Sequence, residues 1–212
     1  MIFEQIGDIY IFSEEEKQKI ADHYSCADDW TKDSLNNIRS SLRNHLLVWQ
    51  LNQCCYCRQK LGHDQRKSDL EHIVDKSGHW EFGFTPQNIA LSCPACNSIK
   101  TSQEVLIDEK VDVSEYPTDG ASFKIVHPYY DRYSDHISIL AGSVYQSKTK
   151  KGSKLIEMCH LYRLASVEEK AKKFKMAQSS VCSVYNEDLT EDERRQRVEE
   201  IRRQIRELNS NR

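Results

Sequence analysis

The sequence predicts an α+β fold, in which a small zinc-stabilised unit of two strands and one helix is embedded in a mainly α-helical body. Two C-x-x-C cysteine pairs flank short strand-like segments, and helical apolar periodicity precedes and follows them. We expect a helical N-terminal scaffold over residues 1–53, a metal-organised core over 54–101, and a mixed, then helical, C-terminal region over 102–212.

The composition is that of a globular protein with one sizeable domain or a small domain surrounded by helices. The chain has 212 residues, of which 38% are hydrophobic and 30% are charged. A formal net charge of -3 gives no overall electrostatic attraction to nucleic acid, so any such contact has to be local. With no long apolar run and no signal-peptide pattern, we expect a cytoplasmic location and no membrane partner.

Helical signals dominate the first fifty residues. Ser13 and Glu16 have the spacing of a capping box. Further along, four apolar residues fall on one helical face and are expected to pack against the core: Ile38, Leu42, Leu46 and Trp49.

The cysteine spacing predicts a structural zinc site. Thiols stay reduced in the cytoplasm, so closely spaced cysteine pairs favour metal binding over disulfides. Two turns that each carry thiolates three positions apart complete a tetrahedral site, whose ligands here are Cys54, Cys57, Cys93 and Cys96. Cys55 is left out because it stands only two positions before Cys57. Cys26, Cys159 and Cys182 stand alone and receive no role.

The 35 residues between Cys57 and Cys93 exceed what a plain zinc ribbon needs, and they include two polar segments. Residues 68–76 read SDLEHIVDK and residues 85–92 read TPQNIALS, after which the second cysteine pair continues into Asn97 and Lys100. We expect strands that end near His72 and Leu91 and a helix that starts at Cys96.

This order of residues resembles the HNH (His-Asn-His) endonuclease family, whose core is a ββα-metal unit of treble-clef type. The resemblance covers Cys54 to Lys100. It implies that His72 is the general base and that Glu71 and Asn97 hold one catalytic Mg²⁺ or Mn²⁺. Asn88 would join the loop to the hairpin by hydrogen bonds. The family more often has Asp where Glu71 stands, so Asp69 could share the metal.

Basic residues at two places are candidates for contact with phosphate. Lys100 follows Asn97 by about one helical turn. Residues 146–154 (QSKTKKGSK) contain no acidic residue, and a solvated loop is the alternative there to phosphate contact by Lys148, Lys150, Lys151 and Lys154.

A second polar cluster contains His127, Asp131, Asp135 and His136. Its spacing is not distinctive of a metal site, and a hydrogen-bonded structural turn is the favoured interpretation.

The C-terminal region shows capping-box spacing at Ser166–Glu169 and again at Thr190–Glu193. The last helix has a short apolar seam that docks either on the domain's own core or on a partner: Val198, Ile201, Ile205 and Leu208.

A looser resemblance covers more of the chain and is to the HNH proteins that accompany an ATPase in Septu-type and retron-linked anti-phage systems. Together the resemblances imply a metal-dependent endonuclease that cleaves DNA in preference to RNA or tRNA and is controlled by an ATPase partner. The alternative is a non-catalytic, zinc-held module that binds nucleic acid or protein.

Overall fold

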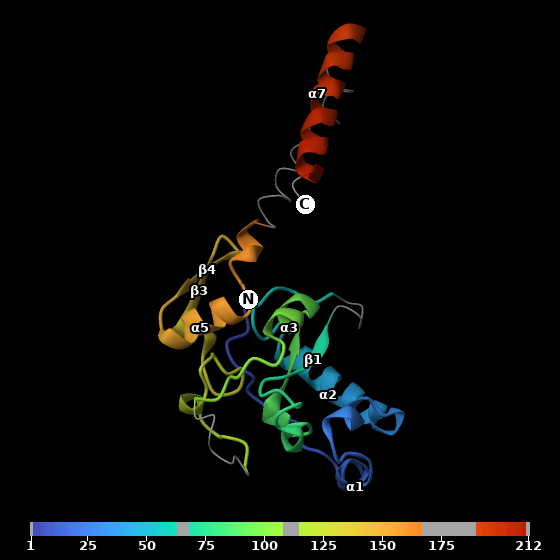
Figure 1. Cartoon of the computed structure of the whole chain (residues 1–212), viewed down its shortest axis with the longest axis vertical. Helices are drawn as coiled ribbons and strands as arrows, with labels where there is room; N and C mark the ends of the chain where they lie inside the picture. Colours follow the sequence, from blue (N-terminus) through green and yellow to red (C-terminus); the bar gives the residue numbers. More distant parts are fainter. Residues whose placement is uncertain (1, 63–67, 108–114, 167–189, 211–212) are drawn as a thin grey trace. The chain divides into compact units, whose positions relative to one another are not determined.

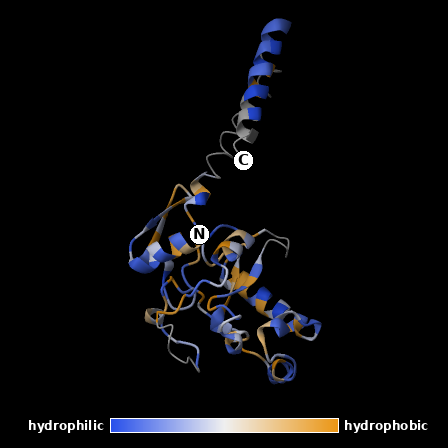
Figure 2. Ribbon diagram, in the orientation of Figure 1, coloured by the Kyte–Doolittle hydropathy of each residue, from blue (hydrophilic) through white to orange (hydrophobic). Residues whose placement is uncertain are grey.

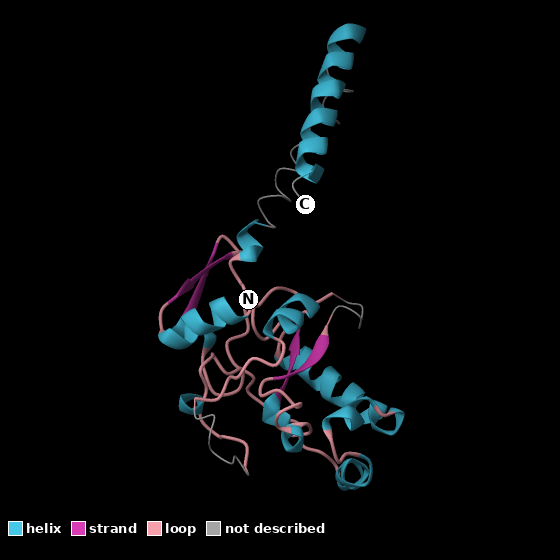
Figure 3. Ribbon diagram, in the orientation of Figure 1, coloured by secondary structure: helices cyan, strands magenta, loops and turns pink. Residues whose placement is uncertain are grey.

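The structure, a computed structural model, describes residues 2–62, 68–107, 115–166 and 190–210 (Figure 1). The fold is α+β, as predicted, with short antiparallel strands among helices and long loops (Figure 3). It contains two compact units, one formed by residues 1–140 with 145–161 and the other by residues 141–144 with 162–212.

The N-terminal scaffold consists of helix α1 (Glu14–His23), two short 3₁₀ turns (Ala27–Thr31 and Asp33–Leu35) and helix α2 (Asn36–Trp49). The predicted capping box is present at Ser13 and Glu16. Ile38, Leu42 and Leu46 are buried as expected. Trp49, the last residue of α2, is 41% exposed, and its indole lies next to Gly7 of the N-terminal segment.

The central unit is an antiparallel hairpin followed by a helix. Strand β1 (Asp69–His72) pairs with β2 (Ile89–Ser92), and helix α3 (Pro94–Lys100) lies against β1 (Figure 1). The register places Asp69 opposite Ser92 and His72 opposite Ile89. Strand β2 is buried throughout and is the core of this unit.

The strands end where expected, but α3 begins at Pro94, two residues before the predicted start. The Cys93 sulfur caps the helix by accepting a hydrogen bond from the Cys96 amide, and proline suits a first helical turn because it has no N–H to satisfy.

After the hairpin and α3, the chain forms a short helix α4 (Tyr133–His136), a second hairpin of strands β3 (Ile137–Leu140) and β4 (Val144–Ser147), and helix α5 (Lys150–Met158). A turn at residues 141–143 connects β3 to β4. Much of the lysine-rich stretch is helical and not a loop, because Thr149 caps α5 through the Gly152 amide.

The second unit contains helix α7 (Glu191–Ser210), whose ribbon is mostly hydrophilic (Figure 2). The predicted capping box at Thr190 and Glu193 is present. Val198 is half-buried and Ile201 is buried. The side chains of Ile205 and Leu208, and most of the predicted capping box at 166–169, lie outside the described residues. None of the described helices has the length and apolarity to cross a membrane.

Candidate functional site

Four cysteine sulfurs come together, two from the first cysteine turn and two from the start of α3. The Sγ atoms of Cys54, Cys57, Cys93 and Cys96 all lie within 4.8 Å of one another, and those of Cys57 and Cys93 are 3.9 Å apart. Tetrahedral zinc with bonds of about 2.3 Å requires sulfurs about 3.8 Å apart. The predicted cysteine set therefore has the composition and spacing to hold a zinc ion.

The cysteine cluster is joined to the hairpin and to α2 by buried hydrogen bonds. The amide of Cys55 donates to the Leu91 carbonyl at 2.8 Å. The fully buried side chain of Gln50 accepts from the Leu91 amide at 2.7 Å and donates to its carbonyl at 2.9 Å. One edge of strand β2 is thus fixed at Leu91 both to the end of α2 and to the first cysteine turn.

Cys159, which received no role from the sequence, lies beside the cysteine cluster. Its thiol is buried at the end of α5 and hydrogen-bonds Cys96, and this interaction leads the effects that lower the pKa of Cys96 to about 4. A stabilised thiolate suits a metal ligand. No local spacing could reveal this contact, because Cys159 is far from Cys96 in sequence.

His72 lies at the end of β1, and the residue is 7% exposed. Its Nε2 is 3.0 Å from the Gly83 carbonyl oxygen, and its ring packs edge-on against Trp30. Since a carbonyl can only accept, we assign the proton of the neutral ring to Nε2, which leaves the Nδ1 lone pair to take up a proton. Burial lowers the pKa of His72 to about 4, so the imidazole is neutral at pH 7.

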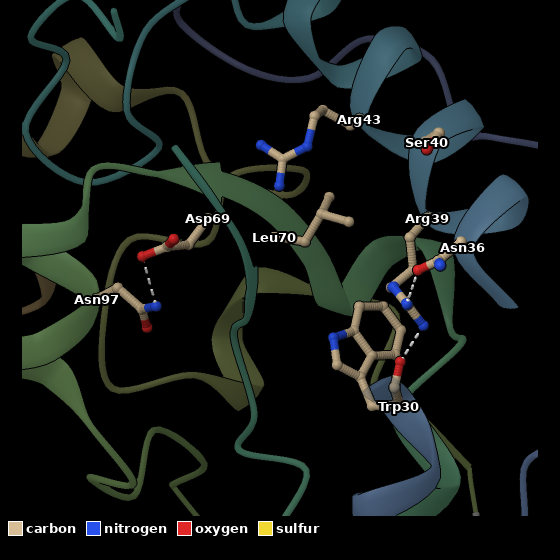
Figure 4. A pocket seen from close by; sticks show the side chains of 8 residues that line it. All are labelled: Trp30, Asn36, Arg39, Ser40, Arg43, Asp69, Leu70 and Asn97. Atoms are coloured by element: carbon tan, nitrogen blue, oxygen red, sulfur yellow. Dashed lines mark hydrogen bonds between the residues drawn. The ribbon is translucent and has the colours of Figure 1, made fainter. Parts of the chain in front are cut away.

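Asp69 and Asn97 form a polar pair, of which Asn97 lines the same cavity as His72. The Asn97 side-chain amide donates to an Asp69 carboxylate oxygen at 2.9 Å (Figure 4), and both side chains are half-buried. This contact joins the first residue of β1 to α3. It leaves the Asn97 carbonyl oxygen and the second Asp69 oxygen as candidate ligands for a hard cation.

Glu71 is more deeply buried than Asp69, and its Oε1 contacts the Lys100 ammonium at 2.9 Å and the Tyr56 hydroxyl at 3.0 Å. Burial is the largest effect on the pKa of Glu71 and raises it. Lys100 is fully buried and also donates to the His72 carbonyl at 3.2 Å. Lys100 thus serves as the internal counter-ion of Glu71, and this burial argues against the phosphate contact expected from the sequence.

Asn88 is fully buried and spans the hairpin and the following loop. Its side chain accepts from the Val74 amide at 2.7 Å and donates to the Val74 and Phe82 carbonyls at 3.0 and 3.1 Å. These bonds fix the loop that carries Gly83, the partner of His72. Asn88 therefore positions the imidazole indirectly.

Two cavities of about 410 Å³ each open beside this site. One is lined by residues that include Glu71, His72 and Lys76, and the other by residues that include Arg39, Arg43 and Asp69. Trp30, Leu70 and Asn97 line both. The shared wall makes them adjoining parts of one cleft along β1, with His72 at one end and two arginines at the other.

The remaining predicted phosphate ligands lie on α5 and before it. Lys148 donates to the Ser134 carbonyl and Lys151 to the Asp131 carboxylate, while Lys154 pairs with Glu157. Lys150 is exposed. None of these lysines lines either cavity of the hairpin cleft, so the structure does not bring them to His72.

The second polar cluster forms a hydrogen-bonded turn. Asp131 accepts from the His127 backbone amide at 2.7 Å and pairs with Lys151 and His136. The His127 ring contacts the Tyr129 amide and the Tyr116 hydroxyl. Within the described residues, the four cysteines form the sole group of three or more His, Cys, Asp or Glu side chains placed to share a metal ion, which favours the structural interpretation of this turn.

Comparison with known proteins gives one informative similarity. No family model matches the sequence. The chain is 24% identical over 119 residues to the Septu protein PtuB of Bacillus thuringiensis. The alignment covers 56% of this chain and 40% of that protein, so the chain spans less than half the length of this relative.

Proposed function

We propose that this chain is a metal-dependent endonuclease of the HNH type, which hydrolyses phosphodiester bonds of nucleic acid, DNA in preference to RNA. The observation that carries the proposal is a neutral, oriented imidazole that lines the same cavity as Asn97, whose side chain is bonded to Asp69, in a unit that also contains a four-cysteine site. The cysteine, histidine and asparagine positions that resemble the family all belong to this unit, which supports a treble-clef arrangement of β1, β2 and α3.

In the proposed reaction His72 acts as the general base. Its Nδ1 takes a proton from a water molecule, and the water oxygen attacks phosphorus while the bond from phosphorus to the leaving oxygen breaks. The low pKa keeps His72 unprotonated above about pH 5 and makes it a weak base. The Gly83 carbonyl stabilises the imidazolium that forms, because it continues to accept from Nε2.

The residues present fit a hard divalent cation at Asp69 and Asn97, since both offer oxygen atoms in an open, half-buried position. Two protein ligands, with water in the other positions, are the arrangement that Mg²⁺ favours. The bound cation would supply charge neutralisation at the phosphate and at the leaving oxygen. We propose Asp69 as the principal acidic ligand, and assign Glu71 to support through Lys100 and Tyr56.

The test is cleavage of supercoiled plasmid and of total RNA in Mg²⁺ by the wild type, His72→Ala and a matched control, His23→Ala. His23 is an exposed histidine at the end of α1. Cleavage lost in His72→Ala and retained in His23→Ala supports the proposal. Equal behaviour of all three proteins would favour the alternative, a zinc-held binding module without chemistry.

The similarity to PtuB supports a role in anti-phage defence, and we propose that an ATPase partner controls the nuclease. The exposed apolar residues of the N-terminal scaffold favour this region as the docking surface. Ile11 is 84% exposed, Val48 70% and Trp49 41%. By contrast, Ile201 of the α7 seam is already buried.

Co-expression with a candidate ATPase tests the partner. We expect a stable complex that Val48→Asp weakens without loss of zinc, while Ile201→Asp lowers the stability of the isolated chain. A complex broken by Ile201→Asp and untouched by Val48→Asp would place docking on α7 instead. No complex at all would contradict partner control.

A further inference from the structure

We infer that Arg39 and Arg43 bind the phosphodiester backbone next to the cleaved bond and so fix the path of the nucleic-acid strand through the hairpin cleft. This inference rests on the proposed function and names its substrate contacts. The net charge of -3 makes such a local basic site necessary, because the molecule as a whole does not attract a polyanion.

The two arginines lie one helical turn apart on α2, so they share one face of the helix. Both guanidinium groups reach the cavity that also contains Asp69 and Asn97 (Figure 4). A strand that lies along this face would meet both cations before its next phosphate reaches the Asp-Asn pair.

Neutral acceptors hold both guanidinium groups in place. Arg43 donates to the backbone carbonyl and hydroxyl of Ser68 at 2.9 and 2.6 Å. Arg39 donates to the carbonyls of Trp30 and Lys32 and to the Asn36 side chain. In the described part of the chain neither arginine forms a direct ion pair, although Asp33 acts on Arg39 and Asp69 on Arg43 through space, so both positive charges are oriented.

Partial burial lowers the pKa of both arginines, yet guanidinium stays charged in proteins. Each group also has more N–H donors than its protein contacts use, and the planar fork suits phosphate oxygens. Asp69 is the one carboxylate among the residues that line this cavity, and it belongs to the proposed cation site. The arginine end of the cleft is thus suited to an anion.

The cleft also explains how a bound strand reaches His72. Trp30, Leu70 and Asn97 line both cavities, so the cavity of Arg39 and Arg43 adjoins the cavity of the imidazole. Trp30 contacts the His72 ring and is held by Arg39 through its carbonyl. Phosphate binding at the arginines therefore orders the strand beside the general base.

The experiment measures binding of a fluorescent 20-nucleotide single strand, as DNA and as RNA, by anisotropy in Mg²⁺. The chain carries His72→Ala so that the strand stays intact. Arg39→Gln and Arg43→Gln should each weaken binding about tenfold. Each should reduce the slope of log affinity against log salt by about 0.7. Arg43→Lys should lose less affinity than Arg43→Gln, because lysine keeps the positive charge and lacks only the planar set of guanidinium donors.

Arg132→Gln is the matched control, since Arg132 is exposed and lines neither cavity. Zinc content and circular dichroism identify any variant that fails to fold. Affinity and salt slope equal to the control in the folded Arg39→Gln, Arg43→Gln double variant would overturn the inference. Competition by polyglutamate as effective as that by DNA would also overturn it, because the site would then be one for acidic peptides.

The inference and the proposed function fail in different ways. If the arginine variants bind normally while His72→Ala still abolishes cleavage, the nuclease stands and the arginine site is wrong. If the arginine variants lose binding while the chain with intact His72 cleaves nothing, the strand-binding site stands and the proposed chemistry is wrong.

Discussion

The hairpin site (Asp69, His72 and Asn97) and the turn cluster (His127, Asp131 and His136) are built from similar residues but differ in how their polar atoms are used. Both contain a buried histidine whose pKa is lowered by burial. In the turn cluster, the Tyr129 amide donates to Nδ1 of His127, so Nε2 carries the proton toward the Tyr116 hydroxyl. Both ring nitrogens of His127 are therefore engaged inside the protein.

His72 has its Nε2 engaged by Gly83 and its ring at the wall of a cleft. The Asp residues differ in the same way, because Asp131 pairs with Lys151 while Asp69 contacts the neutral Asn97. The comparison shows that residue type alone does not define a reactive site. A reactive site is defined instead by the lone pairs that remain available to a ligand.

The largest expected effect is the loss of zinc. Structural zinc contributes on the order of 10 kcal/mol to small metal-held units, so Cys93→Ser should release the metal and unfold the hairpin. Hydrogen exchange should increase most over residues 54–62 and 68–100, and less over residues 127–133. Cys26→Ser is the control because Cys26 is exposed. Equal exchange in the two segments would mean that the cysteine site does not hold the hairpin site.

The second-largest expected effect is a difference in cleavage rate between variants of His72 and of His127. His72→Ala should reduce the cleavage rate by about 10² to 10⁴-fold, the usual contribution of a general base. His127→Gln should leave the rate per folded molecule nearly unchanged, because His127 lines neither cavity of the cleft. Single-turnover plasmid cleavage measures both. A rate lost equally in both variants would contradict the distinction between the two sites.

The buried ion pair provides the third test. Lys100→Met should destabilise the protein by about 3 kcal/mol, because it leaves the Glu71 carboxylate buried without its counter-ion. Adding Glu71→Gln should restore much of this stability. Urea unfolding measures the change. If Lys100→Met stays stable and instead weakens nucleic-acid binding, Lys100 contacts phosphate as the sequence suggested.

The smallest expected effect is a pH dependence of stability from His127. Its folded pKa lies well below the unfolded value near 6.5, so below pH 6.5 the unfolded chain binds the extra proton. Stability is therefore complete above pH 6.5 and falls as the pH decreases, by about 1.4 kcal/mol per pH unit at most. His127→Phe should flatten this slope in melting curves between pH 7 and 5. An unchanged slope would assign the dependence to other groups, His72 foremost.

Local spacing was sufficient for several features of this protein. The four cysteines, the hairpin that ends near His72 and Leu91, and the capping boxes at Ser13 and Thr190 are all present as predicted. Each of these features depends on residues a few positions apart, or on two cysteine turns that share one metal ion. Because such contacts are fixed by turn and helix geometry, the sequence contains them almost directly.

Tertiary packing decided the rest. Three contacts join residues that are 25 to 29 positions apart in the sequence. They are the ion pair of Lys100 with Glu71 and the hydrogen bonds of Asn97 to Asp69 and of Arg43 to Ser68. The sequence predicted phosphate contact for Lys100 and metal binding for Glu71, and packing of α3 on β1 pairs these two buried side chains with each other. Those two roles remain predictions, while Asp69 lines the cavity of Arg39 and Arg43. Whether a polar side chain meets a partner or a ligand depends on which neighbours the fold places around it, and no local spacing specifies that.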